Sequence, residues 1–203
     1  MSGGDRQDPT NELLRQGAAA ARQWVDSVQM GERVSPSDFN WLGLAEVCAL
    51  QARRGVEPGS TIGNDNIDWA RASVSAYQWL ADKDPGYAHS FTLSAMFLRA
   101  YLISRCGAKP GDPILDPQII VDWFWQNVRM SAEEAVAKSA GWRSRLTART
   151  STGKKADRLE VTELRELRYI RLRLNVLRLL SEAGVLVPDA SLKTWLDARE
   201  KLL

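Results

Sequence analysis

Residues 67–106 have the sequence IDWARASVSAYQWLADKDPGYAHSFTLSAMFLRAYLISRC, and this stretch decides the fold. At about 3.6 residues per turn, its first half places apolar residues on one side, namely Trp69, Ala72, Ala76 and Leu80. Polar residues occupy the opposite side, so the pattern predicts an amphipathic helix. Asp84-Pro85-Gly86 ends it, because proline has no backbone N–H and glycine permits a turn. A second, more apolar helix begins near Ala88, and the two should form a hairpin.

An internal repeat with an offset of 52 residues runs through this stretch and relates Gly55 to Gly107. The frame R-x-G-x-x-P-G-x-x-I occurs at residues 53–62 and again at residues 105–114. A glycine after a helix permits a left-handed backbone, and Pro-Gly turns the chain. The sequence therefore predicts two units of helix, Pro-Gly loop and helix, over about residues 36–86 and 88–130.

Capping patterns predict two helices before the hairpin. Thr10 or Asn11 can cap a first helix that runs to about Gln29. Ser35–Asp38 resembles a capping box, in which an acidic side chain follows the serine by three residues, so a second helix is expected from Pro36.

Similar signals predict the helices that follow the hairpin. They are expected from Pro117, from the capping box Ser131–Glu134, over residues 158–183, and from about Ala190. The fold class is therefore all-α, with roughly eight helices in antiparallel hairpins that form a compact, repeat-like bundle.

Two segments lack apolar residues that could anchor them. Residues 1–9 are interpreted as a disordered tail, and residues 147–157, TARTSTGKKAD, as a mobile basic loop. We expect residues 10–203 to form one domain, because a chain of this length can bury a full core without a metal or a disulfide. Cys48 and Cys106 lack CxxC spacing, so reduced thiols are expected.

The chain shows no targeting or membrane pattern. Its first residues, MSGGDRQDP, lack the apolar core of a secretory signal. No window approaches the roughly 18 continuous apolar residues that a membrane helix requires. We therefore expect a cytoplasmic protein without membrane-spanning segments.

The first repeat unit resembles a known helical repeat. Trp41, Leu44, Ala45 and Cys48 have the spacing of the first helix of a tetratricopeptide repeat, and Tyr77, Leu80 and Asp84-Pro85 match the end of its second helix. The resemblance covers about residues 38–106, and the period of 52 residues is longer than the family's 34. It implies a helical protein-binding role and supplies no functional residues.

Charge is distributed unevenly, although the net charge is only +2. Residues 1–141 contain 13 lysines and arginines against 17 acidic residues, a balance of −4, and residues 142–203 contain 14 against 8, a balance of +6. The candidate contact residues lie beside Trp142 and along the next helix: Arg143, Arg145, Arg149, Lys154, Lys155, Arg158, Arg165 and Arg168. Such clusters bind nucleic-acid phosphates, or they form a solvated face with salt bridges.

The surroundings of the arginines on the helix expected over residues 158–183 distinguish these two interpretations. Its apolar residues recur at three and four positions and should face the interior: Leu167, Ile170, Leu174 and Leu177. Arg165 and Arg168 lie on a different side and should stay partly in water. We favour ion pairs between them and Glu163, Glu166 or acidic residues of the N-terminal part over nucleic-acid contact.

Motifs for chemistry are not found, so we predict no catalytic, cofactor-binding or metal-binding residue. His89 is the only histidine, which removes most histidine-dependent metal sites, and a helix start explains its position. Asn64, Asp65 and Asp68 share one loop, but the EF-hand pattern with its twelfth-position glutamate is missing. We interpret these three as helix-capping residues.

These patterns favour a non-enzymatic helical interaction module that binds a protein partner, such as an adaptor, an assembly subunit or an immunity-type inhibitor. The alternative is a helical subunit that binds RNA or DNA through residues 142–173. An apolar groove would favour the first function, and a continuous basic strip would favour the second.

Overall fold

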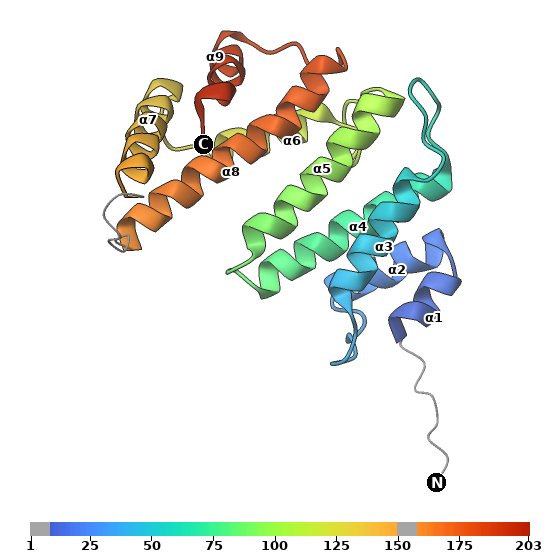
Figure 1. The fold of residues 1–203 in the computed structure, drawn as a ribbon. Helices are drawn as coiled ribbons and strands as arrows, with labels where there is room; N and C mark the ends of the chain where they lie inside the picture. Colours follow the sequence, from blue (N-terminus) through green and yellow to red (C-terminus); the bar gives the residue numbers. More distant parts are fainter. Residues whose placement is uncertain (1–8, 150–157) are drawn as a thin grey trace. The chain divides into compact units, whose positions relative to one another are not determined.

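The computed structural model describes residues 9–149 and 158–203, and the regular elements in these ranges are all helical (Figure 1). The all-α prediction is therefore confirmed for these residues. The chain divides into two compact units, Met1–Asp116 and Pro117–Leu203. The expectation of a single domain stays a prediction, and each unit is described by itself.

The first unit contains five of the helices in the described ranges. They are α1 (Pro9–Arg15), α2 (Ala18–Gln29), α3 (Trp41–Arg53), α4 (Asn64–Lys83) and α5 (Ala88–Cys106). Helix α4 is central, because α2, α3 and α5 all pack against it (Figure 1). The hairpin predicted from residues 67–106 is thus present as α4 and α5.

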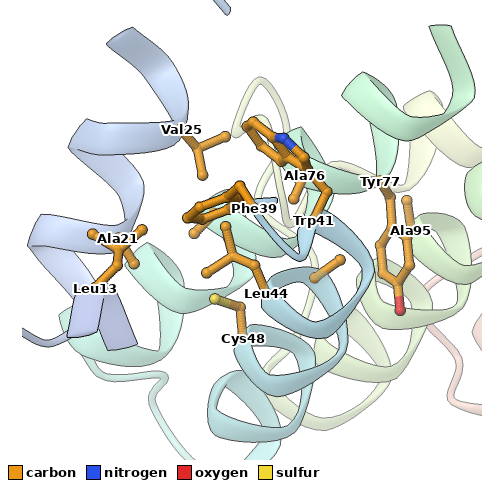
Figure 2. Close-up of a cluster of buried hydrophobic side chains, with 12 residues drawn as sticks. Leu13, Ala21, Val25, Phe39, Trp41, Leu44, Cys48, Ala76, Tyr77 and Ala95 are labelled. Atoms are coloured by element: carbon orange, nitrogen blue, oxygen red, sulfur yellow. The ribbon is translucent and has the colours of Figure 1, made fainter. Parts of the chain in front are cut away.

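Small side chains on α4 allow its neighbours to approach closely. Ala72 and Ala76 are fully buried and face the aromatic and aliphatic residues of α2 and α3. Ser73 is also fully buried, and its hydroxyl donates a 2.8 Å hydrogen bond to the carbonyl oxygen of Ala45 on α3. Figure 2 shows Val25 on one side of Phe39 and Leu44, with Tyr77 on the other. The core therefore joins α2, α3 and α5 around a narrow, alanine-rich α4.

The first predicted helix, from Thr10 or Asn11 to Gln29, is two helices in the structure. Gly17 separates α1 from α2 with a φ of 94°, a value that L side chains rarely adopt. Thr10 is buried on α1, and its hydroxyl accepts a 3.1 Å hydrogen bond from the backbone N–H of Asn40. The prediction of one continuous helix was wrong, because Gly17 permits a break that lets α1 pack on both α2 and α3.

The Ser35–Asp38 box does not begin the second predicted helix. Helix α3 begins at Trp41, and Asn40 caps it by accepting a 2.8 Å hydrogen bond from the N–H of Gly43. The Ser35 hydroxyl oxygen instead accepts a 3.0 Å hydrogen bond from the indole N–H of Trp41. The prediction of a helix from Pro36 was therefore wrong, because a tertiary contact engages the expected cap.

Asn40→Ala is expected to lower the free energy of unfolding by about 1 kcal/mol, because it removes the acceptor for a helix N–H. Urea denaturation of the two proteins measures the difference. Asn40→Ser should recover most of the loss, since serine is also a good N-cap residue. An alanine variant as stable as the wild type would contradict the capping role.

The residues at the start of α4 do not cap it with their side chains. Gly63 occupies the N-cap position without a side-chain hydrogen bond. Asn66 instead donates to the carbonyl oxygens of Ala52 and Arg54 at 3.1 and 3.0 Å, which closes the end of α3. Asp68 accepts a 2.8 Å hydrogen bond from Arg22 on α2. The capping interpretation is wrong for Asp68, which joins α4 to α2.

The two Pro-Gly loops share the backbone feature that the repeat predicts. Gly55 and Gly107 have φ values of 70° and 89°, and Gly59 and Gly111 have values of 77° and 78°. The first helix pair, α3 and α4, lies within one unit, whereas α5 and the following helix belong to different units. The prediction that the two repeat units have the same helix-pair geometry is therefore not tested and stays a prediction.

The second unit contains the remaining helices in the described ranges: α6 (Pro117–Gln126), α7 (Ala132–Arg149), α8 (Arg158–Glu182), α9 (Ala190–Ala198) and the short 3₁₀ helix η1 (Arg199–Lys201). The Ser131–Glu134 capping box is confirmed. The Ser131 N–H donates to the Glu134 carboxylate at 2.8 Å, and the Glu134 N–H donates to the Ser131 hydroxyl at 3.2 Å.

Helix α8 carries the core of the second unit. Its predicted stripe is confirmed, because the side chains of Leu167, Ile170, Leu174 and Leu177 are all fully buried. Helices α6, α7 and α9 each pack on α8 within this unit. None of the helices in the described ranges combines the length and apolar character needed to cross a membrane.

Two predicted flexible segments fall largely outside the described residues. Residues 1–8 and 150–157 are not described, so the disordered tail and most of the basic loop stay predictions. Helix α7 continues to Arg149, and residues 147–149 are therefore helical where the loop was expected to begin.

Cys48 and Cys106 are both free thiols, as the spacing predicted. Cys106 is expected to react with iodoacetamide in the native protein, and Cys48 only after unfolding. Burial raises the pKa of Cys48 to about 12, so the reactive thiolate is scarce. Burial also raises the pKa of Cys106, but a hydrogen bond with Ser60 opposes this, and the side chain is partly exposed. Peptide mass spectrometry after brief labelling tests the order, and equal rates at both thiols would contradict it.

Candidate functional site

An aromatic groove in the first unit is the candidate site. It has a volume of about 400 Å³ and lies between the segment that leads into α3 and the end of α4. Its lining residues are Ser35, Pro36, Ser37, Phe39, Asn40, Trp41, Leu42, Trp79 and Leu80. We call this surface the aromatic groove.

Stacked rings hold the groove in place. Trp41 of α3 and Trp79 of α4 stack with ring centroids 4.2 Å apart and planes 14° apart. Phe39 stacks on Trp24 of α2, with centroids 4.1 Å apart. Trp41 also contacts Phe39 edge-on at 5.2 Å and is itself buried. Three helices therefore fix the aromatic side of the groove, because Trp24 and Trp79 pack against the unit's own core. Figure 2 shows Phe39 and Trp41 within that core.

The rim of the groove combines apolar and polar groups. Leu42, in the first turn of α3, exposes 42% of its surface although it is a large apolar side chain. Ser37 and Asn40 add an exposed hydroxyl and an amide group. The ammonium group of Lys83 lies 5.6 Å from the Trp79 ring centroid, which is a cation–π distance. The groove is thus a fixed apolar surface with hydrogen-bonding groups at its edge.

The groove is not among the sites predicted from the sequence. Trp41 was expected only as part of the tetratricopeptide-like spacing of a helix, and the structure adds its stack on Trp79. The two tryptophans are far apart in sequence, and only the pairing of α3 with α4 brings them together.

The basic residues predicted from the sequence lie in the second unit, where those with described side chains have mixed surroundings. The Arg143 guanidinium donates hydrogen bonds to the Lys201 carbonyl oxygen and to the Ser139 hydroxyl. The Arg145 guanidinium lies 5.7 Å from the centroid of the buried Trp142 ring. Lys154 and Lys155 lie outside the described residues, as do the side chains of Arg149 and Arg158.

Arg165 and Arg168 are exposed on α8, as predicted. Within the part of the chain that the structure describes, no ion pair joins either arginine to Glu163 or Glu166. The favoured ion pairs with Glu163 and Glu166 are therefore not formed there.

Arg173 is buried, unlike the other arginines of α8 whose side chains the structure describes. Its guanidinium donates a 2.7 Å hydrogen bond to the Asn127 carbonyl oxygen and lies 5.8 Å from the Trp123 ring centroid. Burial lowers the pKa of Arg173, and the nearby Glu166 charge opposes the shift. This arginine fixes the end of α6 against α8 and is not available to an external ligand.

No protein-family model, curated protein or solved structure matches the chain. The tetratricopeptide resemblance therefore stays a prediction. Within residues 9–147 and 161–203, no cluster of histidine, cysteine and acidic side chains is arranged to hold a metal ion.

Proposed function

We propose that this protein is a non-enzymatic interaction module that binds a protein partner through the aromatic groove. The observation that carries the proposal is the stacked Trp41–Trp79 pair beside the exposed Leu42. Rigid aromatic rings give large contact area at a low entropic cost, and tryptophan is enriched among the residues that dominate binding energy at interfaces.

The volume and lining of the groove support an apolar side chain as its occupant. A space of about 400 Å³ holds a leucine- or phenylalanine-sized group together with part of the segment that carries it. The Ser37 hydroxyl and the Asn40 amide are positioned at the rim to pair with the backbone of that segment. An adaptor, an assembly subunit and an immunity-type inhibitor would all use such a surface.

The test compares two leucines on the same helix. Leu42 lines the groove, whereas Leu50 does not and exposes 61% of its surface. Both are replaced by glutamine, which is uncharged and leaves the helix dipole unaffected. The tagged full chain and both variants are used to capture proteins from a lysate of the native host.

We expect one protein to be retained by the wild type and by Leu50→Gln, and to be lost with Leu42→Gln. Titration of that purified partner should show affinity weakened at least about tenfold, or about 1.4 kcal/mol, for Leu42→Gln alone. Capture of no specific protein, or equal binding by both variants, would contradict the proposal. Melting curves of the variants establish that both are folded.

The exposure of Arg165 and Arg168 supports nucleic-acid binding as the second candidate function. Cationic side chains without acidic partners are available to phosphates, and the resulting affinity falls steeply with salt. Fluorescence anisotropy with a single-stranded RNA and a DNA duplex tests this function. Salt-sensitive binding that is lost on Arg165→Glu/Arg168→Glu, with melting unchanged, would support it, and no binding at low salt would exclude it.

A further inference from the structure

A second concave region of the first unit is polar and contains no groove residue. It consists of two adjoining cavities of about 690 and 290 Å³. Arg22 of α2 and Arg71 of α4 line both cavities, and Arg99 of α5 lines the smaller one. Three guanidinium groups from three helices therefore converge on one place, together with the loop that follows α5.

Arg71 and Arg99 have buried donors that receive no partner from the described residues. The Nε and Nη1 atoms of Arg99 and the Nε atom of Arg71 are inaccessible to solvent and make no hydrogen bond within those ranges. Burial lowers the pKa of Arg99 to about 10, against the opposing charge of Asp112, so the guanidinium stays charged at neutral pH. These buried nitrogens are closed to a ligand as well as to water. A buried cation with few hydrogen-bond acceptors is nevertheless costly, and an anion held in the adjoining cavity lowers that cost through its charge.

The neighbouring carboxylates are already engaged elsewhere. Asp68 accepts the 2.8 Å hydrogen bond from Arg22, and Asp26 lies 3.6 Å from the same guanidinium. One oxygen of Asp112 accepts hydrogen bonds from the N–H groups of Ile114 and Leu115 at 2.8 and 3.1 Å.

The pKa of Asp112 follows from these contacts. Burial raises it, but the two backbone hydrogen bonds and the charges of Lys109 and Arg71 outweigh burial and bring it below its usual value. Asp112 is therefore ionised and holds the loop in shape. It attenuates the positive field of the arginines without supplying the missing acceptors.

We propose that Arg71 and Arg99 bind the phosphate group of a small phosphorylated polyol, whose hydroxyl-bearing part occupies the larger cavity. Guanidinium forks match phosphate oxygens in geometry and charge, and they form stronger hydrogen bonds with them than with neutral acceptors. The site is separate from the aromatic groove, so the two proposals stand or fall independently.

The lining of the larger cavity selects the class of ligand. Thr61 and Asn64 supply a hydroxyl and an amide group that pair with sugar hydroxyls, whereas the Ser60 hydroxyl already donates to the Glu57 carbonyl oxygen at 2.7 Å. No aromatic side chain lines either cavity among the described residues, so a nucleobase has no ring on which to stack. A sugar phosphate therefore fits better than a nucleotide.

Calorimetric titration with ribose 5-phosphate, at constant ionic strength, tests the site. We expect saturable binding of ribose 5-phosphate, weaker binding of inorganic phosphate, no binding of ribose, and AMP binding no tighter than ribose 5-phosphate, because the base finds no ring on which to stack. Ribose 5-phosphate should also slow the alkylation of Cys106, because this thiol lines the larger cavity.

Arg99→Met and Arg71→Gln should each weaken ribose 5-phosphate binding at least about tenfold, since each removes a charged hydrogen-bond donor. Arg99→Met should melt at or above the wild-type temperature without ligand, because it removes a buried charge with no acceptor. If Arg99→Met does not fold, the affinity of Arg71→Gln for ribose 5-phosphate tests the site. Arg33→Gln, at an exposed position, is the control and should bind as the wild type does.

Four results would overturn the proposal: no saturable binding of ribose 5-phosphate, equal binding of ribose, tighter binding of AMP than of ribose 5-phosphate, or unchanged affinity in the arginine variants. The first and last would remove the anion site, and the middle two would remove the assignment to a phosphorylated polyol.

Discussion

Replacing Trp41 with alanine is expected to lower the free energy of unfolding by about 3–5 kcal/mol. The indole ring is buried between Trp79, Trp24 and Phe39, and its N–H donates to the Ser35 hydroxyl. Removal of the ring leaves a cavity in the core that joins α2, α3 and α4. It also removes the hydrogen bond that holds Ser35 against α3. Urea denaturation of the full chain, followed by far-ultraviolet circular dichroism, measures the loss.

The control for Trp41 is Trp125 on α6, which exposes 38% of its surface. Trp125→Ala removes the same atoms from a position that is partly in water, so its cost should be smaller. Equal losses for the two variants would show that the aromatic cluster does not carry the stability of the first unit.

Leu174→Ala is expected to lower the free energy of unfolding by about 2–5 kcal/mol, because the side chain is fully buried on α8. Leu172 lies on the same helix and exposes 36% of its surface, so Leu172→Ala should cost clearly less. The same denaturation experiment compares them. If both substitutions had the same effect, the assignment of the buried face of α8 would be wrong.

The sequence predicted helices best where caps and apolar periodicity agreed. Pro117 and the Ser131–Glu134 box both mark helix starts, and the stripe through Leu174 faces the interior as its spacing required. These signals are local, because a helix hydrogen-bonds within itself and needs a neighbour only to bury one side.

Predictions failed where a tertiary contact competed with a local pattern. Ser35 has the spacing of an N-cap residue, but its hydroxyl binds the indole of Trp41, and Asn40 caps α3 instead. The helical spacing of apolar residues continues on both sides of Gly17. The pattern alone therefore predicts one helix where the structure has a break between α1 and α2. Neither competition is visible without the fold.

Candidate sites were harder to predict than helices. The basic residues predicted as contacts, beginning with Arg143, are neighbours along the chain. Arg71 and Arg99 belong to different helices and come together only because α4 packs against α5. Trp41 and Trp79 meet in the same way, through α3 and α4. Sites built across helices depend on packing geometry, which residue spacing alone does not contain.

The most direct measurement of the proposed function follows the eight indole N–H groups by ¹H–¹⁵N NMR as the purified partner is added. Resonances assigned by single Trp→Phe substitutions distinguish the groove from the rest of the chain. We predict that the largest shifts belong to Trp79 and Trp41, and that Trp195, which is buried in the second unit, is unaffected. Binding that shifts only tryptophans of the second unit, or none of the eight, would contradict the aromatic groove as the partner site.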